Sequence, residues 1–146
     1  MRLCAVYPSM GIFKMYLRFT APAAPGEWSV TRARLDPGFF RSGYEVWSGD
    51  ASDPIKIAIR RELDWFNENL PVPSRFAVKA KGVWHRDGVC WFRDTADEVI
   101  AHAYVLASLI EACGIRIDKN WTRNPGQILY RDTWQVVAMP ERHRLH

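Results

Sequence analysis

The Cys90 thiol is the strongest candidate nucleophile in this 146-residue chain, with His85 or His102 as its base. A catalytic cysteine needs an exposed, electropositive setting that stabilises the thiolate. Cys90 lies between Val89 and Trp91 in an apolar run, a pattern that predicts a buried thiol. The sequence therefore argues against cysteine catalysis.

Three carboxylates offer a second kind of chemistry. Asp94, Asp118 and Asp132 each stand at the end of a predicted strand, where convergent carboxylates would hold Mg²⁺ for phosphodiester hydrolysis. No lysine stands at a suitable spacing in the last strand, and aspartates at such positions often form turns instead. There is also no H-x-x-x-H motif and no paired cysteine, so we expect no metal site and no cofactor.

The N-terminus of a predicted helix over 96–113 is a candidate anion site, because free amides and the helix dipole favour negative charge there. Arg93 stands just before this helix. Thr95 and Glu98 form a T-x-x-E pattern, which predicts that Thr95 caps the first amides. The cap competes with an anion for the same amides.

Basic residues are concentrated at the two ends of the chain. Residues 1–47 hold six basic and three acidic side chains, residues 115–146 again hold six and three, and the middle holds eight and ten. Arginine beside aromatic rings on a sheet is how many domains bind single-stranded nucleic acid. The residues that would form such a surface are Arg116, Lys119, Trp121, Arg123, Tyr130, Arg131 and Trp134.

The hydrophobic pattern predicts an α+β fold. Strands are expected over 15–20, 28–35, 89–92, 115–118, 128–130 and 134–139, and helices from Asp53 to the residue before Pro71 and over 96–113. Gly and Pro punctuate the rest of 21–52, which predicts irregular structure. We expect a small mixed β-sheet of four to five strands with two main helices on one face. It would include one βαβ crossover over 89–118 and a C-terminal hairpin.

Residues 15–140 are expected to form a single α+β domain. Residues 1–14 are expected to be a weakly ordered leader, with Met15 as an alternative start, and 141–146 a frayed tail.

The helix over 96–113 is apolar nearly all round and carries no Lys or Arg. Such a helix must be covered on two sides. One cover would be a partner chain, which places His102, Val105 and Leu109 at an interface. The competing cover is the aromatic group Phe39, Phe40, Tyr44 and Trp47.

Three unpaired cysteines indicate a reducing compartment, so a cytoplasmic location is expected. No apolar run approaches the roughly 18 residues that span a membrane, so we expect no membrane partner.

The segments LDWFNENLPVP, CWF with the helix that follows it, and NPGQILYRDTWQVVAMP resemble a family of short bacterial proteins with no assigned activity. The resemblance covers roughly residues 55–140. It implies a bacterial source and one domain, and it carries over no catalytic or binding residue.

With no coherent catalytic set, the sequence favours a non-catalytic interaction module that binds itself or another protein as a homo-oligomer or an accessory subunit. Nucleic-acid binding through the basic and aromatic residues, weak and indifferent to sequence, is the alternative. A metal-dependent nuclease-type hydrolase is the second alternative, so enzymatic activity stays open.

Overall fold

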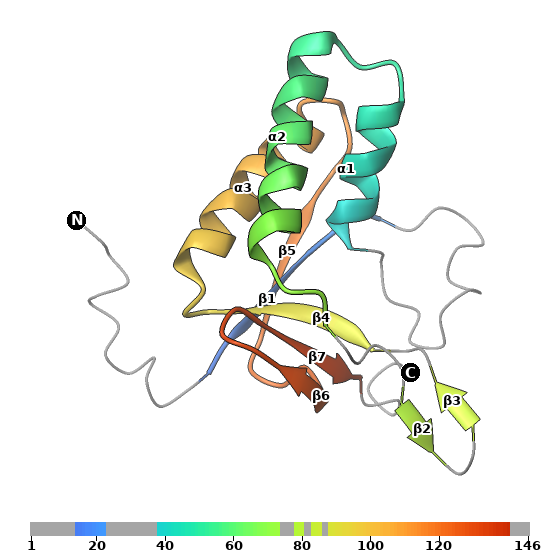
Figure 1. The fold of residues 1–146 in the computed structure, drawn as a ribbon, viewed down its shortest axis with the longest axis vertical. Coiled ribbons are helices and arrows are strands. Elements are labelled where there is room, and N and C mark those ends of the chain that lie inside the picture. The colour runs from blue at the N-terminus through green and yellow to red at the C-terminus, as the bar shows by residue number, and fades with distance from the viewer. Residues whose placement is uncertain (1–13, 23–37, 74–77, 81–82, 86–87, 141–146) are drawn as a thin grey trace.

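The computed structural model describes residues 14–22, 38–73, 78–80, 83–85 and 88–140 (Figure 1). The leader expected over 1–14 lies outside these residues except for Lys14, and so do the strand expected over 28–35 and the tail over 141–146. The elements are β1 (Tyr16–Thr20), α1 (Phe39–Ser48), α2 (Asp53–Asn69), β2 (Val78–Ala80), β3 (Val83–His85), β4 (Val89–Arg93), α3 (Asp97–Glu111), β5 (Asp118–Thr122), β6 (Gln127–Arg131) and β7 (Gln135–Met139). The β2–β3 hairpin was not expected from the sequence.

The main sheet has five strands in the order β5-β1-β4-β7-β6, and the three helices lie together on one side of it (Figure 1). The α+β class, the strand number and the β6–β7 hairpin are confirmed. Every neighbouring pair is antiparallel, so the expected mixed sheet is wrong. The crossover still joins two parallel strands, because β4 and β5 are both antiparallel to β1, which lies between them.

The sheet is strongly twisted. Only residues 123–126 connect β5 to β6, the two edge strands. In a flat five-stranded sheet, the two edge strands would lie about 19 Å apart. Because β5 and β6 run parallel, the connection would also have to run back along the sheet from the end of β5 to the start of β6. Five Cα steps of about 3.8 Å cannot cover both distances. Accordingly, β1 and β5 run at a steep angle to β4, β6 and β7 (Figure 1).

The irregular structure expected after Gly38 is wrong, because residues 39–48 form helix α1. Phe39, Gly43 and Val46 share one face at helical spacing and are buried. Gly43 looked like a helix breaker because glycine is a poor helix former. Its face instead packs where α1 crosses the other two helices, close to Leu63 and Leu106. Tertiary packing therefore overrides the local preference.

Replacing Gly43 with alanine is expected to raise the free energy of unfolding by about 0.5–1 kcal/mol. An added Cβ would lie 3.4 Å from Leu63 Cδ2, 3.6 Å from Leu106 Cδ1 and 3.7 Å from Ile110 Cδ1, which are ordinary contact distances. The alanine would also restrict the unfolded chain. Urea unfolding measures the change, and a loss of stability would mean that α1 lies closer to α2 and α3 than described.

The hydrophobic core lies between the helices and the β1–β4 part of the sheet. Leu17 and Phe19 of β1 are buried, and the Phe19 ring stacks on Phe39 with centroids 4.9 Å apart. Phe92 of β4 packs against Phe66 of α2 at 6.3 Å. Burial along β1 does not alternate, because Tyr16 and Thr20 on the other face are buried as well.

The two helices predicted from the sequence are confirmed, with local corrections. Helix α2 begins after Ser52 and ends before Pro71. Helix α3 begins after Ala96, and no side chain caps it, so the predicted Thr95 cap is wrong. Because Thr95 stands one residue outside the N-cap, its hydroxyl is out of register with the first amides. The strand expected over 115–118 is also corrected, because β5 begins at Asp118 and ends at Thr122.

Candidate functional site

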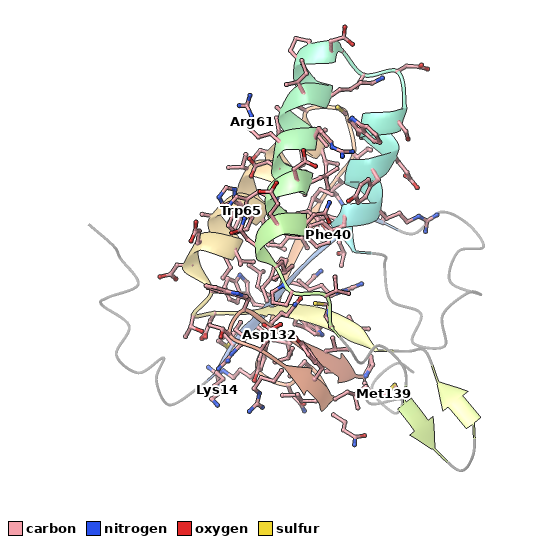
Figure 2. The ribbon with its side chains drawn as sticks, viewed as in Figure 1. Lys14, Phe40, Arg61, Trp65, Asp132 and Met139 are labelled. Carbon is pink, nitrogen blue, oxygen red and sulfur yellow. The ribbon has the colours of Figure 1, made fainter. Side chains whose placement is uncertain are left out.

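A polar network around Asp132, which is labelled in Figure 2, ties the β6–β7 turn together. Asp132 Oδ1 accepts the backbone amides of Trp134 and Gln135 at 2.8 and 2.9 Å. Asp132 Oδ2 accepts the Tyr130 hydroxyl at 2.8 Å and the Gln135 side-chain amide at 3.0 Å. The Cys90 thiol donates to Gln135 Oε1 at 2.9 Å. Gln135 Nε2 also donates to the Pro71 carbonyl oxygen at 2.6 Å, so the network joins the turn to the segment after α2, which is typical of a structural role.

The Cys90 thiol is unsuited to nucleophilic attack. Burial, followed by the negative charge of Asp132, raises its pKa from 9.0 to about 12, although the charge of Arg18 acts in the opposite direction. The thiol is therefore protonated at neutral pH, and its hydrogen-bond acceptor is a glutamine rather than a histidine. The sequence argument against cysteine catalysis agrees with this geometry.

The three aspartates considered for a Mg²⁺ site do not converge. Asp94 contacts Met15, just before β1, whereas Asp118 pairs with Thr20 at the other end of the same strand. Asp132 is held in its own turn. Within the described part of the chain, no group of three or more His, Cys, Asp or Glu side chains is placed to hold a metal ion.

The seven residues proposed for nucleic-acid binding are divided between the two edges of the sheet. Arg116, Lys119, Trp121 and Arg123 lie in or beside β5, and Tyr130, Arg131 and Trp134 lie in or beside β6 and β7. Arg116 is paired with Asp118 at 3.2 Å, and Lys119 with Glu111 at 3.1 Å. Trp121 is 47% exposed, but Trp134 packs against the core. In the order of strands, the first four residues therefore belong to one edge and the last three to the other side of the sheet.

The three residues proposed for a chain interface have different surroundings. His102 Nδ1 lies 2.6 Å from Glu62 Oε1, and the His102 ring stacks on Trp65 at 3.7 Å, so this side of α3 is covered by α2. Leu109 packs against the core. Val105 is 49% exposed. The His102 side of α3 is therefore covered within the chain, whereas Tyr104 and Val105 stay exposed. The aromatic group Phe39, Phe40, Tyr44 and Trp47 was the competing prediction for the cover of α3. It is correct only in part, since Tyr44 and Trp47 are exposed.

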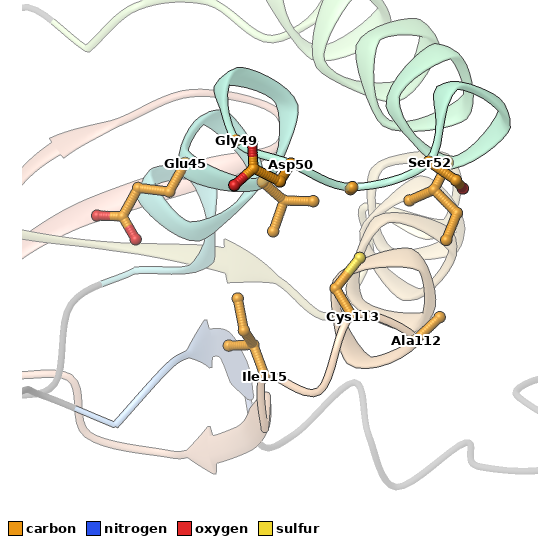
Figure 3. A pocket seen from close by; sticks show the side chains of 10 residues that line it. Glu45, Gly49, Asp50, Ser52, Ala112, Cys113 and Ile115 are labelled. Carbon is orange, nitrogen blue, oxygen red and sulfur yellow. The ribbon is translucent and has the colours of Figure 1, made fainter.

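A pocket of about 510 Å³ opens at the end of the helical layer (Figure 3). It is formed by the end of α1, the turn that leads into α2, and the residues just after α3. Its walls are aliphatic or weakly polar: Val46, Ala51, Ile55, Ala112, Cys113 and Ile115. Its volume is in the range of pockets that bind ligands.

The rim of this pocket is acidic. Asp50 lies just after α1, the Glu45 carboxylate points away from the other labelled lining residues, and the Cys113 sulfur points toward the α1–α2 turn (Figure 3). Glu45 is paired with Arg41 at 3.2 Å, and both side chains are mostly exposed. Asp50 has neither a hydrogen bond nor an ion pair with any described residue. Asp50 is therefore free to meet a ligand.

Two helices also end at this pocket. The C-terminal turns of α1 and α3 contain no Lys, Arg or His, so no side chain of those turns offsets the partial negative charge of the helix ends. The N-terminus of α2 contributes partial positive charge, but Asp53 stands in its first turn. No lining residue is basic. Lys119, which is not a lining residue, pairs with Glu111 in the last turn of α3, but the two charged residues that line the pocket, Glu45 and Asp50, are both acidic in a chain whose net charge is +4.

Sequence reasoning missed this site because it missed α1. Once 39–48 is helical, Glu45 lies one turn from its end, and Gly49 and Asp50 form the turn into α2. The S-G-D-x-S-D-P segment gave the available signal, since Gly ends one helix and Ser-Asp-Pro begins the next.

None of the described helices has the length and apolar character needed to cross a bilayer. No family model, curated protein or solved structure matches this chain.

Proposed function

We propose that this chain is a non-catalytic interaction module that binds a polypeptide partner through the pocket between α1 and α3. The observation that carries the proposal is the combination of aliphatic walls with an unpaired carboxylate, Asp50, at the rim. Apolar surface supplies affinity and a few placed polar groups supply orientation, which is the usual division in binding sites. The free thiols of Cys90 and Cys113 support a reducing, cytoplasmic location.

The two alternatives have less support. Nucleic-acid binding requires basic and aromatic groups on one surface, but the candidate residues lie at opposite edges of the sheet, and Arg116 and Lys119 are paired with acids. A phosphate backbone would also be repelled by the acidic pocket. Hydrolysis through Mg²⁺ requires carboxylates that meet, and Asp94 and Asp118 are at opposite ends of β1.

Site-specific photo-crosslinking tests the proposal. A benzophenone amino acid replaces Ala112, which is exposed and lines the pocket, and the control replaces Ala101, which is exposed on the same helix outside the pocket. We expect a protein adduct of discrete mass from position 112 and none from position 101. Equal adducts from both positions, no adduct, or an adduct that nuclease treatment removes would contradict the proposal.

A further inference from the structure

From the charge and shape of the pocket we infer the chemistry of its occupant: a lysine or arginine side chain of the partner polypeptide, with its charged group at Asp50 and its aliphatic stem along the walls. The inference rests on the proposed function and names the partner's binding group.

Charge selects a cation. Asp50 and the C-terminal ends of two helices lie at the pocket, whereas the Glu45 carboxylate points away from it (Figure 3), and none of the residues that line it is basic. Arg41 neutralises part of the negative charge of Glu45, so Asp50 is the carboxylate whose charge no described side chain offsets. A bound ammonium or guanidinium group would gain most from Asp50 and least from Glu45.

The walls select the rest of the ligand. They are built from short aliphatic side chains such as Ile55, Ala112 and Ile115, and no aromatic ring lines the pocket. This favours a methylene chain over a flat ring, because Lys and Arg lay their stems on apolar surface while the charge stays hydrated. A volume of about 510 Å³ leaves room for the residues that flank the basic one, which favours a peptide over a free amine.

Cys113 provides a built-in reporter of occupancy. Its thiol is free and lines the pocket, so an occupant should slow its alkylation by iodoacetamide, a neutral reagent that the acidic rim does not repel. Cys90 does not interfere, because burial raises the pKa of its thiol to about 12. A Cys4→Ser background removes the remaining thiol.

The probes are three acetylated, amidated tripeptides: Leu-Lys-Leu, Leu-norleucine-Leu and Leu-Glu-Leu. The lysine peptide should protect Cys113 from alkylation. The norleucine peptide keeps the aliphatic stem without the ammonium group, so it should protect Cys113 more weakly. The glutamate peptide should not protect Cys113. Equal protection by the lysine and norleucine peptides would overturn the inference. So would stronger protection by spermidine, a free polyamine, than by the lysine peptide.

Two matched variants locate the charge. Asp50→Asn should raise the half-protecting concentration of the lysine peptide about three- to fivefold, the size expected for one partly exposed ion pair. Glu68→Gln removes the same charge at the opposite end of α2, outside the pocket lining, and should leave that concentration unchanged. Equal effects of the two variants would overturn the inference. If position 112 crosslinks to a protein but the lysine peptide gives no protection, the occupant is wrong and the proposed function stands. If both fail, the proposed function is wrong as well.

Discussion

Replacing Leu106 with alanine is expected to lower the free energy of unfolding by about 2–5 kcal/mol. Leu106 is completely buried in α3, in the core cluster that also contains Leu17 and Phe92. Its Cδ1 atom lies close to Gly43 of α1, so the side chain fills the space where two helices meet. Truncation leaves a cavity that three packed elements cannot easily close.

The adjacent residue provides the control. Val105 is 49% exposed on the same helix, so Val105→Ala should change stability by no more than about 0.5 kcal/mol. Urea unfolding of the two variants measures both effects under one condition. Similar losses from Leu106→Ala and Val105→Ala would mean that α3 is rotated relative to the core, or that Val105 is buried in an assembly.

Replacing Asp132 with alanine is expected to cost about 1–3 kcal/mol, because four donors lose their acceptor at once. Gln135 is 1% exposed and keeps its bond to the Pro71 carbonyl, so the loss falls mainly on the two turn amides and the Tyr130 hydroxyl. Asp132→Asn keeps one acceptor oxygen and should cost less. An unchanged urea midpoint in the alanine variant would contradict a structural role for the network.

The same residue gives a pH dependence. Burial alone would raise the pKa of Asp132, but hydrogen bonds from Gln135, Trp134 and Tyr130 outweigh it and lower the pKa below its ordinary value of 3.8. A carboxylate with a lowered pKa stabilises the fold above the ordinary value, and this contribution is lost as the pH falls through the lowered one. The stability gap between the wild type and Asp132→Asn should therefore narrow below about pH 3.8.

Strong hydrophobic periodicity explains which elements could be predicted from the sequence. Alternation around Leu17 and Phe19 predicted β1, and the apolar stripe that contains Ile59, Leu63 and Phe66 predicted α2. Asn124-Pro125-Gly126 predicted the turn before the hairpin, where Gly126 has a φ of 111°. In each case the local pattern and the tertiary environment agree.

The elements that could not be predicted depend on contacts between distant parts of the chain. Gly43 argues locally against a helix, and only its packing against Leu63 and Leu106 explains α1. The place of β1 between β4 and β5 is likewise a long-range fact, because the crossover predicts parallel strands but not what lies between them. The pocket combines residues 45–55 with 112–115, and no sequence motif joins these two segments.

The most direct test of the pocket as the binding site is the dependence of the crosslink from position 112 on Asp50. The benzophenone residue is placed at position 112 in three backgrounds: wild type, Asp50→Asn and Glu68→Gln. We predict one protein adduct whose yield falls in Asp50→Asn and is unchanged in Glu68→Gln, with a lysine or arginine in or beside the crosslinked peptide. A yield that is equal in all three backgrounds, or an adduct that is absent from all of them, would contradict the account.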